Sequence, residues 1–293
     1  MRSILLLTAL AASALFAAPA GDAPDLLAKA RDAYQRNQAQ EKHWNWTATE
    51  TRSLVNKAGT IVQAFPDVTA ESVIRNDGRR CNAVVSWGDG RKPYLADADS
   101  DARCQAMELF RAPFAMASLL EGAGATVVEH SEYAITLGIV PDRTRLKSKD
   151  PAVRCAASIR ATLKLDPATF FPAQLEGEVV ESGCDLQFAP VTQYGSRNRA
   201  PVKSSFRKGA AFRMEFALQH DKFGHPENSF WICVAQRYVQ PWNTDDSSLY
   251  YWGGRVPVTA GEAAHRLIKE VRTTAKEFGG ESQLRFDTVD KPQ

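Results

Sequence analysis

The sequence predicts an α+β fold in which antiparallel β-strands predominate and short helices pack against them. Two observations support this prediction. Many short segments alternate between apolar and polar residues and are separated by turn residues, a pattern that is typical of antiparallel strands. Three other segments carry their apolar residues at helical spacing. No internal repeat or low-complexity linker divides residues 21–293, so we expect a single domain.

The clearest strand is predicted over residues 155–165, where every second residue is apolar. A tight Asp-Pro turn should return the chain as a partner strand, with Leu163 facing Leu175. One bulge in this hairpin would bring Cys184 alongside Cys155. The sequence therefore predicts a cross-strand disulfide between these two cysteines.

The other predicted strands show the same alternation. In the first of them, Trp44, Trp46 and Ala48 point to one side, and threonines point to the other. The last two should form a long hairpin, and Phe216 lies on the apolar side of its first strand. These strands are predicted over residues 43–52, 60–65, 71–75, 81–87, 126–139, 174–180, 210–219 and 229–239.

Three segments are predicted to be helical. Residues 22–40 carry one apolar stripe that needs a surface to cover. Residues 100–122 are rich in Met, Phe and Leu and should form two small helices that interrupt the sheet. The third helix is predicted to begin at Thr259, because Thr259 and Glu262 have the spacing of a capping box, and to end at Gly279.

The first 20 residues are predicted to be a cleavable secretory signal. Arg2 precedes an apolar run over residues 4–18, and Ala18-Pro19-Ala20 has the small side chains that signal peptidase requires. The run is shorter than the roughly 20 residues of a membrane-spanning helix, and no later stretch comes closer. We therefore expect a periplasmic or secreted protein without a transmembrane segment. No Cys follows the cleavage point to accept a lipid anchor.

All five cysteines lie after the predicted signal, so export would carry them into an oxidising compartment that favours disulfides. Cys81 and Cys104 flank a turn region and form the second candidate pair. Cys233 is then left over, and we expect it to be buried in a strand. Zinc is the weaker interpretation, because the sequence has no C-x-x-C motif and no suitably spaced His.

The order of predicted elements resembles that of the LolA and LolB family of lipoprotein carriers. The closest similarity in residues is the hairpin over residues 158–167 and 171–177, with its Asp-Pro turn. The resemblance implies a curved antiparallel sheet, an incomplete β-barrel packed with short helices, whose cavity takes acyl chains. This chain departs from the carriers in its length, its five cysteines and its predicted last helix, and no residue matches the gating arginine of the family.

Composition and the absence of known motifs disfavour several other classes of function. A formal net charge of +2, without Lys or Arg runs between aromatic residues, disfavours nucleic acid as a partner. No catalytic or nucleotide-binding motif occurs, so we expect neither a cofactor nor a known catalytic site. A metal near His220 and His225, or calcium at the acidic residues 97–101, is less favoured than a solvated loop.

Three functions remain in order of preference. The first is an exported binder of an apolar ligand, either an acyl chain or a lipoprotein, and the second is an envelope module that binds another protein. The third is a secreted hydrolase whose site would bring His130 or His220 to a carboxylate or hydroxyl group. For the first, the alternative for each candidate residue is ordinary core packing. The residues predicted to line the cavity are Trp44, Trp46, Met107, Phe110, Phe114, Met116, Leu120 and Phe216.

Overall fold

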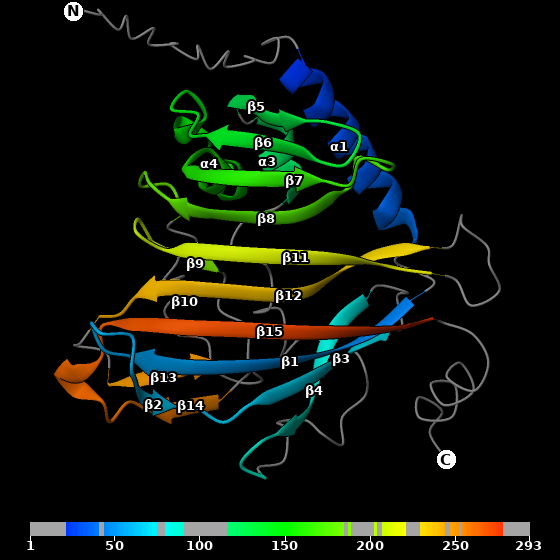
Figure 1. Cartoon of the computed structure of the whole chain (residues 1–293). Helices are drawn as coiled ribbons and strands as arrows, with labels where there is room; N and C mark the ends of the chain where they lie inside the picture. Colours follow the sequence, from blue (N-terminus) through cyan, green and yellow to red (C-terminus); the bar gives the residue numbers. More distant parts are fainter. Residues whose placement is uncertain are drawn as a thin grey trace, which may run out of the picture.

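In the computed structural model, the chain forms one large antiparallel sheet with helices packed against part of it (Figure 1). The sheet contains 11 strands in the order β4-β3-β1-β15-β12-β11-β8-β7-β6-β5, and β2 pairs with β1. Its end strands, β4 and β5, do not pair with each other in the described residues, so the sheet is open. The structure describes residues 22–40, 44–74, 80–90, 116–122, 124–184, 187–188, 202–203, 207–220, 229–243, 247–251 and 254–277.

The strand pattern of the sequence is largely confirmed, and with it the predicted fold class. All nine predicted strand segments contain strands, and the segment 126–139 contains two. The large sheet consists of β1 (Trp44–Val55), β2 (Ile61–Ala64), β3 (Val68–Ile74), β4 (Arg80–Trp87), β5 (Gly124–His130), β6 (Ile135–Val140), β7 (Ile159–Leu165), β8 (Pro172–Val179), β11 (Ala211–Gln219), β12 (Phe230–Pro241) and β15 (Arg266–Glu277). Two small ribbons are formed by β9 (Gln187–Phe188) with β10 (Val202–Lys203) and by β13 (Ser248–Tyr251) with β14 (Gly254–Pro257).

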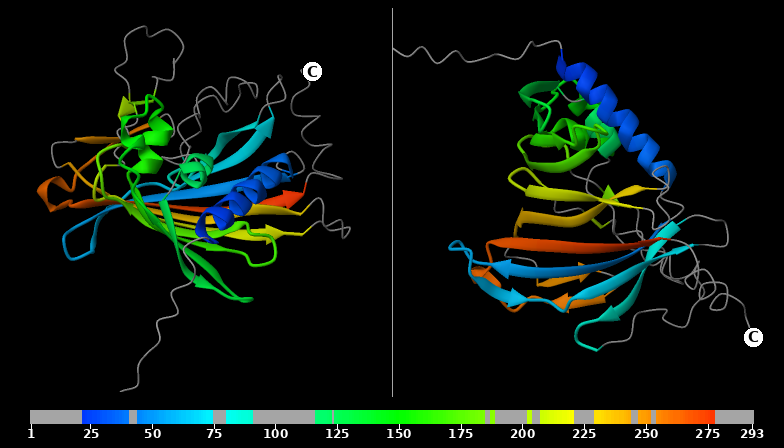
Figure 2. Two further views of the ribbon diagram at one scale, coloured as in Figure 1. Left: turned by 90° about the horizontal axis from the view of Figure 1, so that it is seen from above. Right: turned by 45° about the vertical axis from the view of Figure 1, so that its right-hand side comes forward.

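Helices pack against the half of the sheet that contains β5 to β8 (Figure 2). Helix α1 (Asp22–Gln40) has the bounds that the sequence predicts, and α3 (Met116–Gly122) falls within the predicted helical insertion. Helix α4 (Pro151–Ala157) and the short turns η3 (Arg145–Lys147) and η5 (Gly261–Ala263) complete the set of described helices. Apolar side chains of α1, α3 and α4 share one buried core with those of β6, β7 and β8. None of the described helices is both long and apolar enough to cross a membrane.

The other face of the sheet is polar. Cross-strand ion pairs follow one another from β7 to β15 on residues that are about half exposed. Each such pair contributes only about 0–1 kcal/mol to the free energy of folding, but charged side chains of this kind are typical of a solvent-exposed face. A site for an apolar ligand therefore belongs on the opposite face. The pairs are Arg160 with Glu178 at 3.5 Å, Arg213 with Glu176 at 3.7 Å, and Arg237 with Glu270 at 3.2 Å.

The predicted disulfide between Cys155 and Cys184 is confirmed, although its first cysteine lies in a helix rather than in a strand. Asp150 caps the N-terminus of α4 by accepting a hydrogen bond from the backbone of Ala152, and Pro151 occupies its first turn. The alternation from residue 159 onward is that of β7, which pairs Leu163 with Leu175 as predicted. The apolar residues at positions 155 and 157 extended this pattern by coincidence.

The helix predicted from Thr259 is wrong, because the segment contains only the short turn η5 and then the 12-residue strand β15. The error has a physical cause. The spacing of four between Leu267, Val271 and Ala275 places residues on one face of a helix and also on one face of a strand. The strand forms because β15 lies between β1 and β12 and pairs with both.

Some predictions fall on residues that the structure does not describe. Cys104, Met107, Phe110 and Phe114 lie outside the described ranges. The backbone of Cys81 belongs to β4, but its side chain is not described, so the second predicted disulfide stays a prediction. The signal over residues 1–20 stays a prediction for the same reason.

Candidate functional site

The large sheet forks between β12 and β15. Their described pairs extend along both strands only as far as Ala235 and Arg272. Beyond this point β12 continues to Phe230 beside β11, and β15 continues to Glu277 beside β1. Figure 1 shows the right-hand ends of β12 and β15 apart, near the lower end of α1. The fork leaves space between two strands that are neighbours elsewhere.

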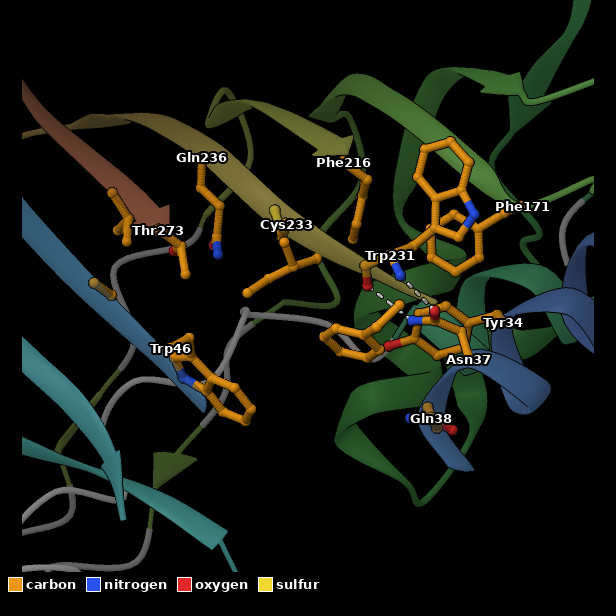
Figure 3. A pocket seen from close by; sticks show the side chains of 14 residues that line it. Tyr34, Asn37, Gln38, Trp46, Phe171, Phe216, Trp231, Cys233, Gln236 and Thr273 are labelled. Atoms are coloured by element: carbon orange, nitrogen blue, oxygen red, sulfur yellow. Dashed lines mark hydrogen bonds between the residues drawn. The ribbon is translucent and has the colours of Figure 1, made fainter. Parts of the chain in front are cut away.

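A cavity of about 220 Å³ lies at this fork, between the sheet and the C-terminal part of α1 (Figure 3). Six of the side chains that line it are aromatic, and most of its lining residues remain partly exposed, so solvent reaches it. Its volume is below the roughly 300–1,000 Å³ of pockets for drug-sized ligands, so it suits a single apolar chain rather than a bulkier ligand. The lining consists of Tyr34, Asn37, Gln38, Trp46, Ala48, Phe171, Phe216, Phe230, Trp231, Ile232, Cys233, Gln236, Val271 and Thr273.

Phe171 is the centre of the aromatic wall. Its ring stacks on Trp231, with centroids 5.0 Å apart, and on Tyr34 at 6.1 Å, and it meets the edge of Phe216 at 5.6 Å. These separations are typical of favourable aromatic pairs. Four elements therefore contribute to one rigid apolar surface: α1, the turn after β7, β11 and β12.

The turn between β7 and β8 places Phe171 in this wall. Asp166 accepts hydrogen bonds from the backbone and the hydroxyl group of Thr169, at 2.8 and 2.6 Å. Phe170 has a φ of 60°, a left-handed conformation that is unusual for a bulky residue. The ammonium group of Lys29 on α1 lies 5.0 Å from the centroid of the Phe170 ring. The turn thus directs Phe170 towards α1 and Phe171 into the cavity wall.

Asn37 joins α1 to the free side of β12. Its Nδ2 donates to the carbonyl oxygen of Trp231 at 2.8 Å, and its Oδ1 accepts from the Trp231 backbone N–H at 2.7 Å. Both backbone groups of one residue point to the same side of an antiparallel strand, so those of Trp231 point away from β11. The Asn37 amide therefore takes the place that a neighbouring strand would occupy.

The polar part of the cavity is built around Gln236. Its Oε1 accepts a hydrogen bond of 2.7 Å from the hydroxyl group of Tyr238, and its side chain acts to lower the pKa of the nearby Cys233 thiol. Burial raises the pKa of Cys233 to about 12 and raises the pKa of Tyr238 as well. Both groups are therefore neutral near pH 7. Cys233 lies in a strand, as predicted, but it is only partly buried.

A buried ion cluster lies farther along the same face of the sheet. Glu50 is fully buried, forms an ion pair with Arg52, and lies 3.5 Å from the ammonium group of Lys269. Burial lowers the pKa of Lys269, and the Glu50 carboxylate opposes this effect. Val271, which is opposite Glu50 in the pairing of β1 with β15, lines the cavity and separates it from Lys269.

The structure places the predicted ligand-lining residues in three different settings. Trp46 and Phe216 line the cavity. Trp44 does not line the cavity but is buried and stacks on the lining residue Phe230 at 6.3 Å. Met116 and Leu120 belong to the buried core beneath α1, which is the alternative of ordinary packing.

Several lining residues were not among the sequence candidates. Tyr34 lies in the predicted helix over residues 22–40, Phe171 in the hairpin motif, and Trp231 in the predicted strand over residues 229–239. This strand is apolar on both faces, which is a usable signal because such a strand must be covered on both faces. Nothing in the local sequence indicates that Asn37 bonds to a strand 194 residues away.

The described part of the chain does not support the hydrolase and metal sites that the sequence left as alternatives. His130 and His220 are both exposed, on β5 and directly after β11. No group of three or more metal-binding side chains occurs among the described residues. His225 and the acidic residues 97–101 lie outside the described ranges.

Comparisons with known proteins find similar folds. No family model matches the chain, and no curated protein matches it in sequence. Solved structures that match include a putative outer membrane lipoprotein-sorting protein domain from Vibrio parahaemolyticus, at 12% identity, covering 90% of this chain and 100% of the other. A DUF1329 family protein from Desulfovibrio piger matches at 8% identity, with 89% and 96% covered, and a LolA superfamily protein from Nitrosomonas europaea at 6%, with 87% and 96% covered. The TM-score is 0.34 for each. The LolA superfamily, which the sequence layout resembles, is thus among these matches.

Proposed function

We propose that this protein binds an apolar ligand, such as the end of an acyl chain, in the cavity at the fork of the sheet. The observation that carries the proposal is the aromatic wall around Phe171 beside an accessible space of about 220 Å³. Burying one methylene group contributes about 0.8 kcal/mol, so five of them would contribute about 4 kcal/mol. This is enough for a weak but specific complex if the wall is already rigid.

We propose that binding takes place in the periplasm or outside the cell. The predicted secretory signal supports this location. The disulfide between Cys155 and Cys184 supports it independently, because stable disulfides are rare in a reducing cytosol.

Binding of a hydrophobic fluorescent probe to the purified full-length protein tests the proposed function. We expect the probe to become brighter with the protein and to be displaced by decanamide. Ala48→Phe should abolish this signal, because Ala48 lines the cavity and the larger ring fills it. Thr51→Phe, on the other face of β1, is the matched control and should bind as the wild type does.

A second cavity-filling variant tests the same site in case Ala48→Phe does not fold. Thr273→Leu adds apolar volume to the same cavity from β15 and should weaken probe binding at least tenfold in a protein that melts normally. Full probe binding by both filling variants, provided that they are folded, would refute the proposed site.

Binding of another envelope protein is the second candidate, and the β5–β6 hairpin favours it. Val128 and Tyr133 are 66% and 83% exposed at this edge of the sheet. The irregular register around Val128 is the kind of bulge that protects edge strands from pairing, which weakens this candidate. Capture of one stoichiometric partner that is lost in Tyr133→Ser, with no probe displacement, would favour it over ligand binding.

A further inference from the structure

We infer that the cavity selects ligands whose polar group is an uncharged amide or ester, and that it discriminates against ligands that carry a carboxylate. This inference rests on the proposed function, because it concerns the polar end of the same ligand. It follows from the chemistry of the polar side chains at the fork.

The polar positions of the cavity are uncharged. Among the described residues that line it, Asn37, Gln38 and Gln236 carry primary amides, and Thr273 carries a hydroxyl group. A charged ligand group that leaves water needs an opposite charge or several hydrogen bonds in exchange. Neutral amides satisfy a carbonyl oxygen well, but they compensate a carboxylate only in part.

The orientation of Gln236 suits a carbonyl oxygen. Its own Oε1 is occupied by the Tyr238 hydroxyl group at 2.7 Å, so its NH₂ group is the part that is left for the cavity, which Gln236 lines. An NH₂ group carries two donors. These donors are available to the carbonyl oxygen of a ligand.

Among the described residues, the cations farther along the same face of the sheet are engaged elsewhere. Arg52 and Lys269 both lie beside the Glu50 carboxylate. Val271 is only 1% exposed and stands between Lys269 and the cavity on β15. The cluster therefore presents a buried carboxylate as well as cations, and it offers no isolated positive charge to an anionic ligand.

The surroundings of the Cys233 thiol disfavour negative charge. Burial is the largest cause of the raised pKa of Cys233, and the charge of Glu215 on β11 adds to it. Within the described ranges, Lys29 and Tyr34 on α1, Tyr238 on β12 and the ion cluster of Glu50 also lie near this wall. An anion placed beside Cys233 meets the same unfavourable surroundings.

Competition between matched ligands tests the inference. Decanamide, methyl decanoate, decanoate and decane share one chain and differ in their polar group, and each is titrated against a bound hydrophobic probe at pH 8. We expect the amide and the ester to bind at least tenfold more tightly than decanoate. Lowering the pH to 5.5 should strengthen decanoate binding, because a carboxyl group with a pKa of about 4.3 to 5 is then more often protonated. Binding of the amide should not change.

Gln236→Met provides the residue-level test. It removes the donor and keeps the volume, so amide and ester binding should weaken about tenfold while decane binding stays the same. Gln174→Met, on the polar face of β8, is the control and should change nothing. Equal binding of all four ligands would overturn the inference and leave the proposed function intact. If none of them binds, the proposed function fails as well.

Discussion

At the scale of residues, Asn37 explains how a forked sheet avoids unsatisfied backbone groups. Its amide is the side-chain group that most resembles a peptide group, because a donor group and an acceptor oxygen lie side by side. Both are used on Trp231, at 2.8 and 2.7 Å. A buried backbone group without a partner costs about 1–3 kcal/mol, so the residue stabilises the open end of β12.

Asn37→Asp should destabilise the protein at neutral pH and recover in acid. The introduced carboxylate still accepts from the Trp231 N–H but faces the Trp231 carbonyl oxygen without a donor, which should cost about 1–3 kcal/mol. Protonation restores the donor, so the pKa of the introduced group is raised in the folded state. The full loss of unfolding free energy is therefore present well above the folded-state pKa. It disappears as the pH falls below the unfolded-state pKa of about 3.9.

Urea unfolding of this variant at pH 7 and pH 4 measures the effect. Gln35→Glu, an exposed position on the same helix, is the matched control and should show little change at either pH. An unfolding free energy of Asn37→Asp that equals that of the wild type at pH 7 would mean that the bond between α1 and β12 contributes nothing.

Other residues of the site could be predicted from the sequence only in part. Trp46 and Phe216 were identified because alternation places them on the apolar side of a strand. The roles of Phe171 and Trp231 could not be predicted, because their ring contact joins a turn to a strand 60 residues later and depends on tertiary structure.

At the scale of elements, prediction from local sequence pattern was most accurate where paired strands follow each other directly in the sequence. The hairpin of β7 and β8 has its predicted register, Leu163 opposite Leu175, because turn chemistry fixes it. β15 was missed because its partners, β1 and β12, lie far away in the chain. Pairing on both sides then outweighs the local helical preference of the segment.

Leu267→Ala and Ile268→Ala together test whether this segment is a strand. In a strand these neighbours point to opposite faces, and Leu267 is 5% exposed in the core while Ile268 is only half-buried. We expect Leu267→Ala to lower the free energy of unfolding by about 2–5 kcal/mol and Ile268→Ala by less than about 1.5 kcal/mol. Equal losses, measured by urea unfolding, would support the helical stripe on which both residues lie.

At the scale of the whole molecule, an antiparallel sheet with one solvated face and one covered face was predictable from alternation and turns, whereas its incompleteness was implied only by the resemblance to the lipoprotein carriers. The cavity was not, because it arises where β12 leaves β15 and where α1 bonds to the separated strand. The apolar insertion over residues 100–122 was expected to contribute most of the lining. Its described part, α3, packs in the core beneath α1 instead.

Locating a bound apolar chain is the most direct test of whether the cavity at the fork binds ligand. Crystals of the protein grown with decanamide brominated at its last carbon would reveal the chain end by the anomalous scattering of bromine. We expect one bromine position within the cavity, between the rings of Trp46 and Trp231. Bromine bound only elsewhere on the surface, or a cavity that stays empty at saturating ligand, would contradict it.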